Sequence, residues 1–468
     1  MSDVRLTDFV KAYDVRGTVP DQLDTAVSRA FGAAFVRVLR REGPISSIVI
    51  VHDMRPSSPD LANAFADGAA TEGADVIMAG LGSTDMAYFA AGSLDMPGAM
   101  FTASHNPAKY NGIKLCRAAA LPIGLDTGLA EIRDVAQAIL DGTDTPHADM
   151  PGTVTERDLL GPYAAHLRSL VDLTGIRPLK VVVDAGNGMA GYTVPAVLGD
   201  EKLDPLPLSI EPLYFELDGT FPNHEANPLE PKNLVDLQAA VVEHGADIGL
   251  AFDGDADRCF VIDENGAPVS PSAVTALVAT RELAKHPGAV VIHNLITSSA
   301  VPEIIAENGG TPVRTRVGHS FIKAEMARTG AVFGGEHSAH YYFKDFWGAD
   351  TGMLAAMHML AALGGQSLPL SEFAARFERY VASGEINTTV ADPVGKLADV
   401  EATLAGPDAR DGVTADHLDG LTVRYADGGW LNLRPSNTEP LLRLNVEAPS
   451  RERMAQLRDA ALAVVRTG

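Results

Sequence analysis

The sequence predicts an α/β protein of several domains. Mixed, mainly parallel sheets are expected in three related α/β domains, with a smaller α+β domain at the C-terminus. Short β-branched runs alternate with longer segments of helical spacing, the pattern of parallel α/β sheets. A Gly-Ala pair leads three times into an apolar run that ends in a polar loop, at 98–107, 245–258 and 330–340. For 468 residues, roughly three or four domains of about 150 residues are expected.

The individual strands and helices follow from the same patterns. Runs at 47–51, 180–183 and 289–292 are rich in the β-branched residues typical of buried strands. At 59–72 and 234–241 apolar residues recur every third or fourth position, which predicts helices. The smaller domain is predicted from three strand-like runs and a following helix, at 421–425, 430–433, 441–446 and 451–465.

Changes in composition predict where the domains end. Segments rich in proline, glycine or polar residues lie near 141–153, 263–271 and 364–371. We therefore expect domains at 1–150, 151–264, 265–368 and 369–468. Ligands bind at the carboxyl ends of strands in open α/β sheets, so the three polar loops are expected to converge on one central cleft.

The net charge of -24 limits the classes of partner. Such a charge repels nucleic acid and anionic membrane surfaces, so neither is expected as a partner. An anionic substrate would require the protein to gather its cations in one place or to recruit a metal. Two cysteines, Cys116 and Cys259, give no disulfide framework, which favours the cytoplasm. No apolar run approaches the roughly 18 residues of a membrane span.

A cation site is predicted in the D-G-D-A-D-R loop at 253–258. Asp253, Asp255 and Asp257 alternate with two small residues after a strand, so their carboxylates can converge on one hard cation. Magnesium fits this oxygen-only set best. The plain alternative is a solvated acidic turn, although three alternating carboxylates repel one another without a cation.

Two other interpretations of this loop are weaker. In a calcium EF-hand, Glu264 would stand at the twelfth place, but Arg258 occupies the sixth place, where glycine is required. In an enzyme resembling the haloacid dehalogenase group, Asp253 would be the nucleophile and Asp255 the acid/base. Ala256 stands where that group has threonine or valine.

Ser104 is the candidate nucleophile. It lies in the polar turn T-A-S-H-N-P at 102–107, where its hydroxyl could receive and donate a phosphoryl group or could merely cap a turn. Ten residues later, Lys114 could supply positive charge or transfer a proton, or could be a solvated surface lysine.

Two further loops offer phosphate-binding groups. The segment Arg434, Pro435, Ser436, Asn437 and Thr438 combines a guanidinium, hydroxyls and an amide, which suits a phosphate cradle or a polar hairpin. The segment 186–191 matches the glycine fingerprint of dinucleotide binding, with Glu211 about 25 residues further on. Prolines in between weaken the dehydrogenase alternative, and we interpret these glycines as a tight strand-to-helix turn.

Four motifs in order resemble those of the α-D-phosphohexomutase family. They are T-A-S-H-N-P at 102–107, D-G-D-A-D-R at 253–258, G-E-H-S-A-H at 335–340 and R-P-S-N-T-E-P at 434–440. With 13–17, the resemblance spans essentially the whole chain and is greatest to the bacterial phosphomannomutase/phosphoglucomutase subgroup. It implies four domains around a central cleft, the last a mobile lid. His337 and Ala339 stand where that subgroup often has methionine and glycine, so the exact hexose stays open.

The resemblance also implies a role for each matching residue. Ser104 would carry the phosphoryl group, and the metal set would be Ser104, Asp253, Asp255 and Asp257. Sugar hydroxyls would bind Glu336 and Ser338, and the distal phosphate would bind Arg434, Ser436, Asn437 and Thr438. The other catalytic positions would be Arg16, His105, Lys114, Arg258, His319 and His340. Lys114, His319 and His340 all remain candidates for the general base.

The resemblance thus implies a phosphohexomutase that interconverts hexose 1-phosphate and hexose 6-phosphate, with mannose or glucose as the hexose. Transfer would proceed through phospho-Ser104 and a bound hexose 1,6-bisphosphate, with Mg²⁺ as cofactor and glucose 1,6-bisphosphate as activator. The alternatives are a phosphoglucosamine mutase, a sugar-phosphate phosphatase and a non-catalytic sugar-phosphate binder. A small phosphosugar is the expected partner of a cytoplasmic monomer or weak homodimer.

Overall fold

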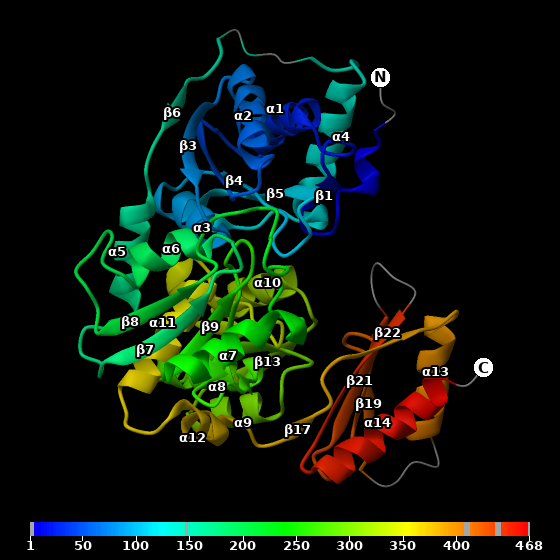
Figure 1. The fold of residues 1–468 in the computed structure, drawn as a ribbon. Coiled ribbons are helices and arrows are strands. Elements are labelled where there is room, and N and C mark those ends of the chain that lie inside the picture. Colours follow the sequence, from blue (N-terminus) through cyan, green and yellow to red (C-terminus); the bar gives the residue numbers. More distant parts are fainter. Residues whose placement is uncertain (1–3, 146–147, 149, 407–411, 436–440, 467–468) are drawn as a thin grey trace. The chain divides into compact units, whose positions relative to one another are not determined.

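The computed structural model describes residues 4–145, 148, 150–406, 412–435 and 441–466 (Figure 1). The chain divides into two units by its contacts. One unit comprises residues 1–269 and 338–371, and the other comprises residues 270–337 and 372–468.

The first sheet of the first unit has the strand order β1-β5-β4-β2-β3-β6. Strands β2, β3, β4 and β6 run parallel, whereas β5 is antiparallel to both of its neighbours. Helix α1 packs against α2 and α4, and together they cover a core rich in phenylalanine, valine and alanine. The elements are β1 (Val15–Thr18), α1 (Thr25–Glu42), β2 (Ser47–His52), α2 (Ser58–Thr71), β3 (Asp75–Leu81), α3 (Thr84–Ser93), β4 (Gly98–Phe101), β5 (Tyr110–Cys116), α4 (Leu129–Leu140) and β6 (Val154–Glu156).

The second sheet of this unit has the order β11-β10-β9-β7-β8. Strand β7 runs parallel to β8 and β9, and β10 forms an antiparallel hairpin with β9. The elements are α5 (Leu160–Leu170), β7 (Leu179–Asp184), α6 (Ala190–Val197), β8 (Leu208–Leu213), α7 (Val235–His244), β9 (Ile248–Phe252), β10 (Cys259–Asp263) and β11 (Pro268–Val269). Residues 338–371 add β15 (Tyr341–Phe343), β16 (Ala349–Asp350) and the buried helix α11 (Gly352–Gly364).

The second unit begins with another parallel arrangement. Strand β12 pairs in parallel with both β13 and β14. The elements are α8 (Pro271–Lys285), β12 (Val290–Asn294), α9 (Ala300–Glu307), β13 (Thr311–Thr315), α10 (His319–Thr329) and β14 (Phe333–Gly335). Helix α12 (Leu370–Ala374) lies where the chain re-enters this unit.

The C-terminal part of the second unit is an antiparallel sheet with two helices. Figure 1 shows α13 and α14 lying along the sheet in orange and red, and both helices contact its strands. The elements are β17 (Val381–Ala382), β18 (Ile386–Thr389), α13 (Pro393–Leu404), β19 (Thr414–Asp416), β20 (Leu421–Arg424), β21 (Trp430–Pro435), β22 (Leu441–Ala448) and α14 (Arg451–Val465). The predicted α/β fold class with a smaller C-terminal α+β part is confirmed.

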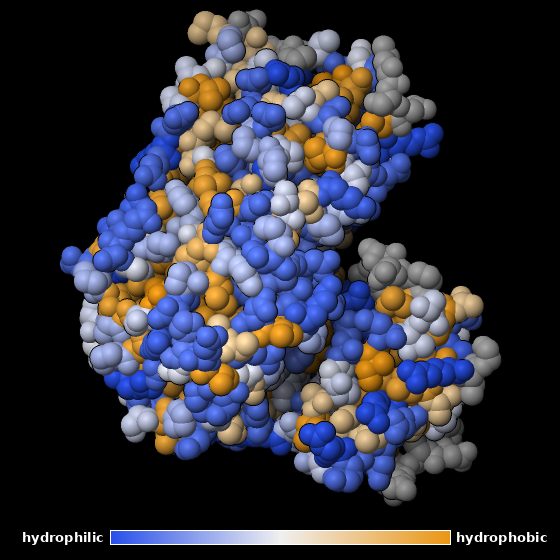
Figure 2. All heavy atoms as spheres, in the orientation of Figure 1, coloured by the Kyte–Doolittle hydropathy of each residue, from blue (hydrophilic) through white to orange (hydrophobic). Residues whose placement is uncertain are grey.

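The surface combines hydrophilic and hydrophobic residues. On the face drawn in Figure 2, hydrophilic residues predominate and hydrophobic residues are scattered among them. Cys116 and Cys259 are both buried. Among the described residues, no helix is both long enough and apolar enough to cross a membrane.

Candidate active site

Ser104, the predicted nucleophile, lies in the turn after β4. Its hydroxyl Oγ donates a hydrogen bond to Asp253 Oδ2 at 2.9 Å, and its amide donates to Thr102 Oγ1 at 2.8 Å. The backbone of Ser104 is left-handed, with a φ of 50°, and the residue is buried. A non-glycine residue rarely adopts this conformation, so the surrounding contacts must hold it. They hold the Ser104 hydroxyl against the aspartate loop.

The aspartate loop joins β9 to β10, and its three carboxylates converge. Asp253, Asp255 and Asp257 are buried, and one ligand oxygen from each lies within 4.8 Å of the others. Thr84, the first residue of α3, holds the loop from one side. Its Oγ1 donates to Asp255 Oδ2 at 2.6 Å and its amide donates to the Asp255 carbonyl at 3.0 Å.

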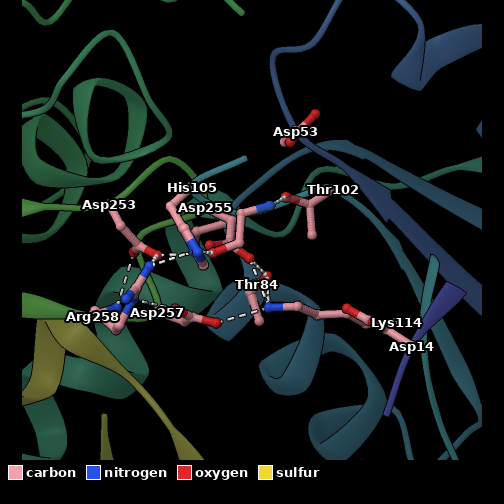
Figure 3. Close-up of polar contacts among 12 residues, drawn as sticks. Asp14, Asp53, Thr84, Thr102, His105, Lys114, Asp253, Asp255, Asp257 and Arg258 are labelled. Carbon is pink, nitrogen blue, oxygen red and sulfur yellow. Dashed lines mark hydrogen bonds and ion pairs between the residues drawn. The ribbon is translucent and has the colours of Figure 1, made fainter. Parts of the chain in front are cut away.

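Two cations neutralise part of this negative charge (Figure 3). Lys114 Nζ donates to Asp255 Oδ2 at 2.7 Å and to Asp257 Oδ2 at 2.8 Å. Arg258 places Nε and Nη2 at 2.9 and 2.8 Å from Asp253 Oδ2. Arg258 Nη2 also donates to His105 Nδ1 at 2.6 Å. A guanidinium only donates, so His105 Nδ1 is an acceptor in this contact.

The pKa values of Asp253, Lys114 and His105 are shifted by burial and by these neighbouring charges. Burial raises the pKa of Asp253, and the other two aspartates add to the effect, although Arg258 opposes it. Burial opposes the charged form of Lys114, but the two aspartates outweigh it and hold the pKa of Lys114 well above its usual value. Burial and the neighbouring guanidiniums lower the pKa of His105 well below its usual value. At neutral pH Lys114 is therefore a cation and His105 is neutral.

The donor set fits a hard divalent cation. Asp255 Oδ1 and Asp257 Oδ1 are buried and find no hydrogen-bond partner among the described residues. A buried carboxylate oxygen without a partner is costly, and carboxylate oxygens are preferred ligands of Mg²⁺. Asp253, Asp255 and Asp257 would hold such an ion.

Backbone contacts pack the aspartate loop from both sides. A Cβ at Gly254 would lie 2.5 Å from the Ser104 carbonyl oxygen, and a Cβ at Gly188 would lie 2.7 Å from the Gly254 carbonyl oxygen. Met189 N donates to that same Gly254 carbonyl at 2.9 Å. The glycines of 186–191 thus form the predicted turn between β7 and α6, and they allow it to pack directly behind the aspartate loop.

Three more predicted residues lie near these groups in the first unit. Arg16 donates to Asn106 Oδ1 at 2.7 Å, in the loop that carries Ser104, and to Asp14 Oδ2 at 2.5 Å. His340 Nε2 lies 3.7 Å from Asp257 Oδ1. His340 Nδ1 and Ser338 Oγ are 3.1 Å apart.

Other predicted residues belong to the second unit or lie outside the described residues. Glu336 Oε2 accepts from Asn294 Nδ2 at 3.2 Å and from Gly318 N at 3.3 Å. Arg434 Nη2 donates to Glu385 Oε2 at 2.9 Å. His319 begins α10, but its side chain lies outside the described part. Ser436, Asn437 and Thr438 also lie outside the described residues.

Sequence reasoning missed residues that support the Ser104 and aspartate loops. Thr84 contacts Asp255, and the buried Arg55 contacts the loop of Ser104. Both residues follow shortly after a strand of the first sheet, β3 and β2 respectively. The other loops were identified by polar residues just after a buried strand. The same signal could have identified Thr84 and Arg55.

Known proteins with similar sequences and structures are sugar-phosphate enzymes. A phosphomannomutase of Salmonella montevideo is 40% identical over 95% of each chain. Phosphohexose mutases of Xanthomonas campestris are 41% identical over 98% of this chain and 97% of theirs. The crystal structure of a phosphoglucomutase/phosphomannomutase family protein from Burkholderia thailandensis has a TM-score of 0.84 at 32% identity and covers 98% of both chains. The fold, the site and these relatives define an isomerase of the hexose-phosphate mutase class.

Four family models assign the chain more closely. The α/β/α domains I, II and III of phosphoglucomutase/phosphomannomutase match residues 8–141, 161–266 and 270–380, and the C-terminal domain matches residues 385–464. The chain belongs to the phosphoglucomutase/phosphomannomutase family.

Proposed function

We propose that this enzyme interconverts the 1-phosphate and 6-phosphate of mannose or glucose through a phosphoryl group carried on Ser104. The observation that carries the proposal is the 2.9 Å hydrogen bond from Ser104 Oγ to Asp253 Oδ2, within a cluster of three carboxylates and two cations. Relatives named phosphomannomutase favour mannose as a substrate. The proposal includes a cytoplasmic location and a small phosphosugar as partner.

Each turnover transfers a phosphoryl group twice. The free hydroxyl of the hexose monophosphate attacks the phosphorus of phospho-Ser104, the bond to Ser104 Oγ breaks, and a hexose 1,6-bisphosphate forms. The hydroxyl proton passes to a base among Lys114, His319 and His340, Ser104 Oγ takes up a proton as it leaves, and the second transfer reverses both proton movements. The bisphosphate turns around, and Ser104 Oγ takes back the other phosphoryl group. Phospho-Ser104 is regenerated, and the isomer leaves without consuming water.

Phosphoryl transfer depends mainly on positioning and on stabilisation of charge on the phosphoryl oxygens. Lys114, Arg258 and Arg16 supply cations near Ser104. A Mg²⁺ ion held by the three aspartates would withdraw further charge from these oxygens. Arg434, with Ser436, Asn437 and Thr438, is proposed to bind the distal phosphate, because a guanidinium can hold two phosphate oxygens at once.

Phosphorus NMR tests the proposal. Purified protein with Mg²⁺ and a trace of glucose 1,6-bisphosphate receives mannose, glucose or glucosamine 1-phosphate in separate samples. Formation of mannose or glucose 6-phosphate without free phosphate is the expected result. Conversion of glucosamine phosphate alone, release of free phosphate, or an unchanged spectrum would instead indicate the glucosamine mutase, the phosphatase or the binder.

The role of Ser104 is tested by Ser104→Ala, with Ser169→Ala as the matched control. Ser169 is an exposed residue of α5 whose hydroxyl donates only to the His166 carbonyl. Ser104→Ala should abolish turnover, whereas Ser169→Ala should behave as the wild type. Full mutase activity in Ser104→Ala would refute the phosphoserine mechanism.

A further inference from the structure

The Arg55 side chain is buried beneath the loop that carries Ser104, and it uses every hydrogen-bond donor it has. A guanidinium has five N–H groups. Arg55 Nε donates to Asp53 Oδ2 at 3.2 Å. The other four donors reach the backbone carbonyls of Ser104 at 2.8 Å, Asn106 at 2.7 Å, Pro107 at 3.1 Å and Tyr110 at 3.0 Å. One side chain therefore binds four carbonyl groups within seven residues of the chain.

Asp53 and Arg55 hold each other in place. Both side chains are fully buried, and Asp53 Oδ1 also accepts from the Arg55 amide at 3.0 Å and from Ser58 Oγ at 2.6 Å. The Arg55 guanidinium lies 5.2 Å from the centre of the Phe221 ring. The attraction within a buried ion pair offsets its desolvation only if additional hydrogen bonds satisfy its remaining donors and acceptors, and here every donor of the guanidinium is bonded. Arg55 is thus a rigid support.

The Ser104 carbonyl lies between this support and the aspartate loop. Arg55 Nη2 donates to the carbonyl oxygen at 2.8 Å, and Gly254 approaches the same oxygen so closely that a Cβ there would lie 2.5 Å away. The same residue turns its hydroxyl to Asp253 in a left-handed conformation. The position of Ser104 Oγ relative to the aspartates therefore depends on where Arg55 holds the carbonyl.

We propose that Arg55 is a positioning residue for phosphoryl transfer, which sets the place of Ser104 Oγ against the aspartate loop through four backbone carbonyls. This inference rests on the proposed function, in which Ser104 carries the phosphoryl group. The Arg55 side chain is fully buried and uses all its donors within the protein, so its loss should slow the transfer step and leave the binding of phosphosugar unchanged.

Arg55→Lys is the decisive variant. Lysine keeps the positive charge beside Asp53, but it has three donors on one atom and cannot span the four carbonyls. A displacement of about 1 Å costs about 10²-fold in rate, so kcat should fall by about 10²-fold while KM stays within about 3-fold. The matched control is Arg168→Lys, because Arg168 likewise binds three backbone carbonyls, of Val197, Gly199 and Asp204, away from Ser104. The control should keep the wild-type kcat.

A single-turnover experiment separates positioning from damage to the fold. Protein freed of phosphate is mixed with glucose 1,6-bisphosphate that carries labelled phosphate, in the presence of Mg²⁺. The amplitude of labelling counts competent molecules, and the rate reports the transfer step. Arg55→Lys should reach the wild-type amplitude about 10²-fold more slowly. A wild-type labelling rate at any amplitude would overturn the inference. A reduced amplitude at the wild-type rate would mean only that fewer molecules of the variant are folded.

Gly219→Ala is the second variant, in case Arg55→Lys does not fold. A Cβ at Gly219 would lie 2.7 Å from Arg55 Cα and 2.9 Å from Pro56 Cδ, so alanine displaces Arg55 without altering its guanidinium. Labelling should slow by roughly 3-fold to 30-fold, and a wild-type rate would overturn the inference.

Wild type and Ser104→Ala are labelled in parallel. If the wild type is labelled and Ser104→Ala is not, the phosphoserine proposal is upheld. A wild-type rate in Arg55→Lys would then refute only the positioning role of Arg55. An unlabelled wild type or a labelled Ser104→Ala would defeat both.

Discussion

Gly254→Ala tests the close contact between the aspartate loop and Ser104, the proposed nucleophile. The residue is not in the left-handed backbone region, so alanine brings a steric effect without backbone strain. Its Cβ would lie 2.5 Å from the Ser104 carbonyl oxygen, whereas ordinary contacts begin near 3.4 Å. The Ser104 and aspartate loops must therefore separate by roughly 0.9 Å, and Arg55 prevents the Ser104 carbonyl from giving way.

The expected consequence is a loss of rate with little loss of substrate binding. A misplacement of about 1 Å costs about 10²-fold in rate, which corresponds to about 2.7 kcal/mol in the barrier. The assay follows formation of mannose 6-phosphate at saturating Mg²⁺, and thermal unfolding is measured on the same samples. Gly161→Ala is the control, because a Cβ at this position in α5 meets nothing within 4 Å. A kcat for Gly254→Ala within about 3-fold of the control would refute the argument.

Three further predictions concern single side chains. Arg434→Ala should raise KM for the phosphosugar by about 10-fold to 100-fold at nearly constant kcat, because the proposed distal-phosphate site would lose one charged hydrogen-bonding partner. An unchanged KM in steady-state kinetics would contradict this. Lys114→Met should lower the free energy of unfolding without Mg²⁺ by about 3 kcal/mol, because Asp255 and Asp257 lose their cation, and Mg²⁺ should raise Tm more in the variant than in the wild type. Burial opposes the charged form of His224, but Asp184 raises the pKa of His224 above its usual value, so their pair stabilises the fold below about pH 6.5 and loses this effect as pH rises through the folded pKa. The Tm difference between wild type and His224→Gln should therefore shrink between pH 6 and pH 9, and a constant difference would exclude the pair as its cause.

Much of the fold was predictable from local patterns. The helix predicted at 59–72 is α2 (Ser58–Thr71), and the strand predicted at 180–183 is β7 (Leu179–Asp184). Periodicity reports which face of an element is buried, and it therefore locates the element within a residue or two. The antiparallel position of β5 between β1 and β4 was not predictable, because pairing joins residues far apart in the chain.

The candidate site was predictable where its chemistry is carried by side chains in one loop. Asp253, Asp255 and Asp257 alternate within five residues of one loop, and their mutual repulsion favours a bound cation over a solvated acidic turn. The position of Arg55 after a strand is visible in the sequence, but its role was not predictable, because its partners are backbone carbonyls, which every residue possesses. The close backbone contacts of Gly254 and Gly188 were also not predictable, because the sequence does not show which backbone atoms lie within contact distance of a glycine.

The charge balance explains how an acidic protein can accept an anionic substrate. Lys114 and Arg258 bond directly to the three aspartates, whereas Arg16 is paired with Asp14. The cluster beside Ser104 therefore carries about one net negative charge once all three aspartates are ionised, which the raised pKa of Asp253, about 8, opposes in the absence of a cation. In a buried site that excess repels a phosphoryl group more strongly than it would in water. A divalent cation on the free carboxylate oxygens would reverse the sign of the excess. In the proposed function, the third aspartate would therefore make acceptance of a phosphoryl group depend on the cation. Two aspartates balanced by the same two cations would not create this dependence.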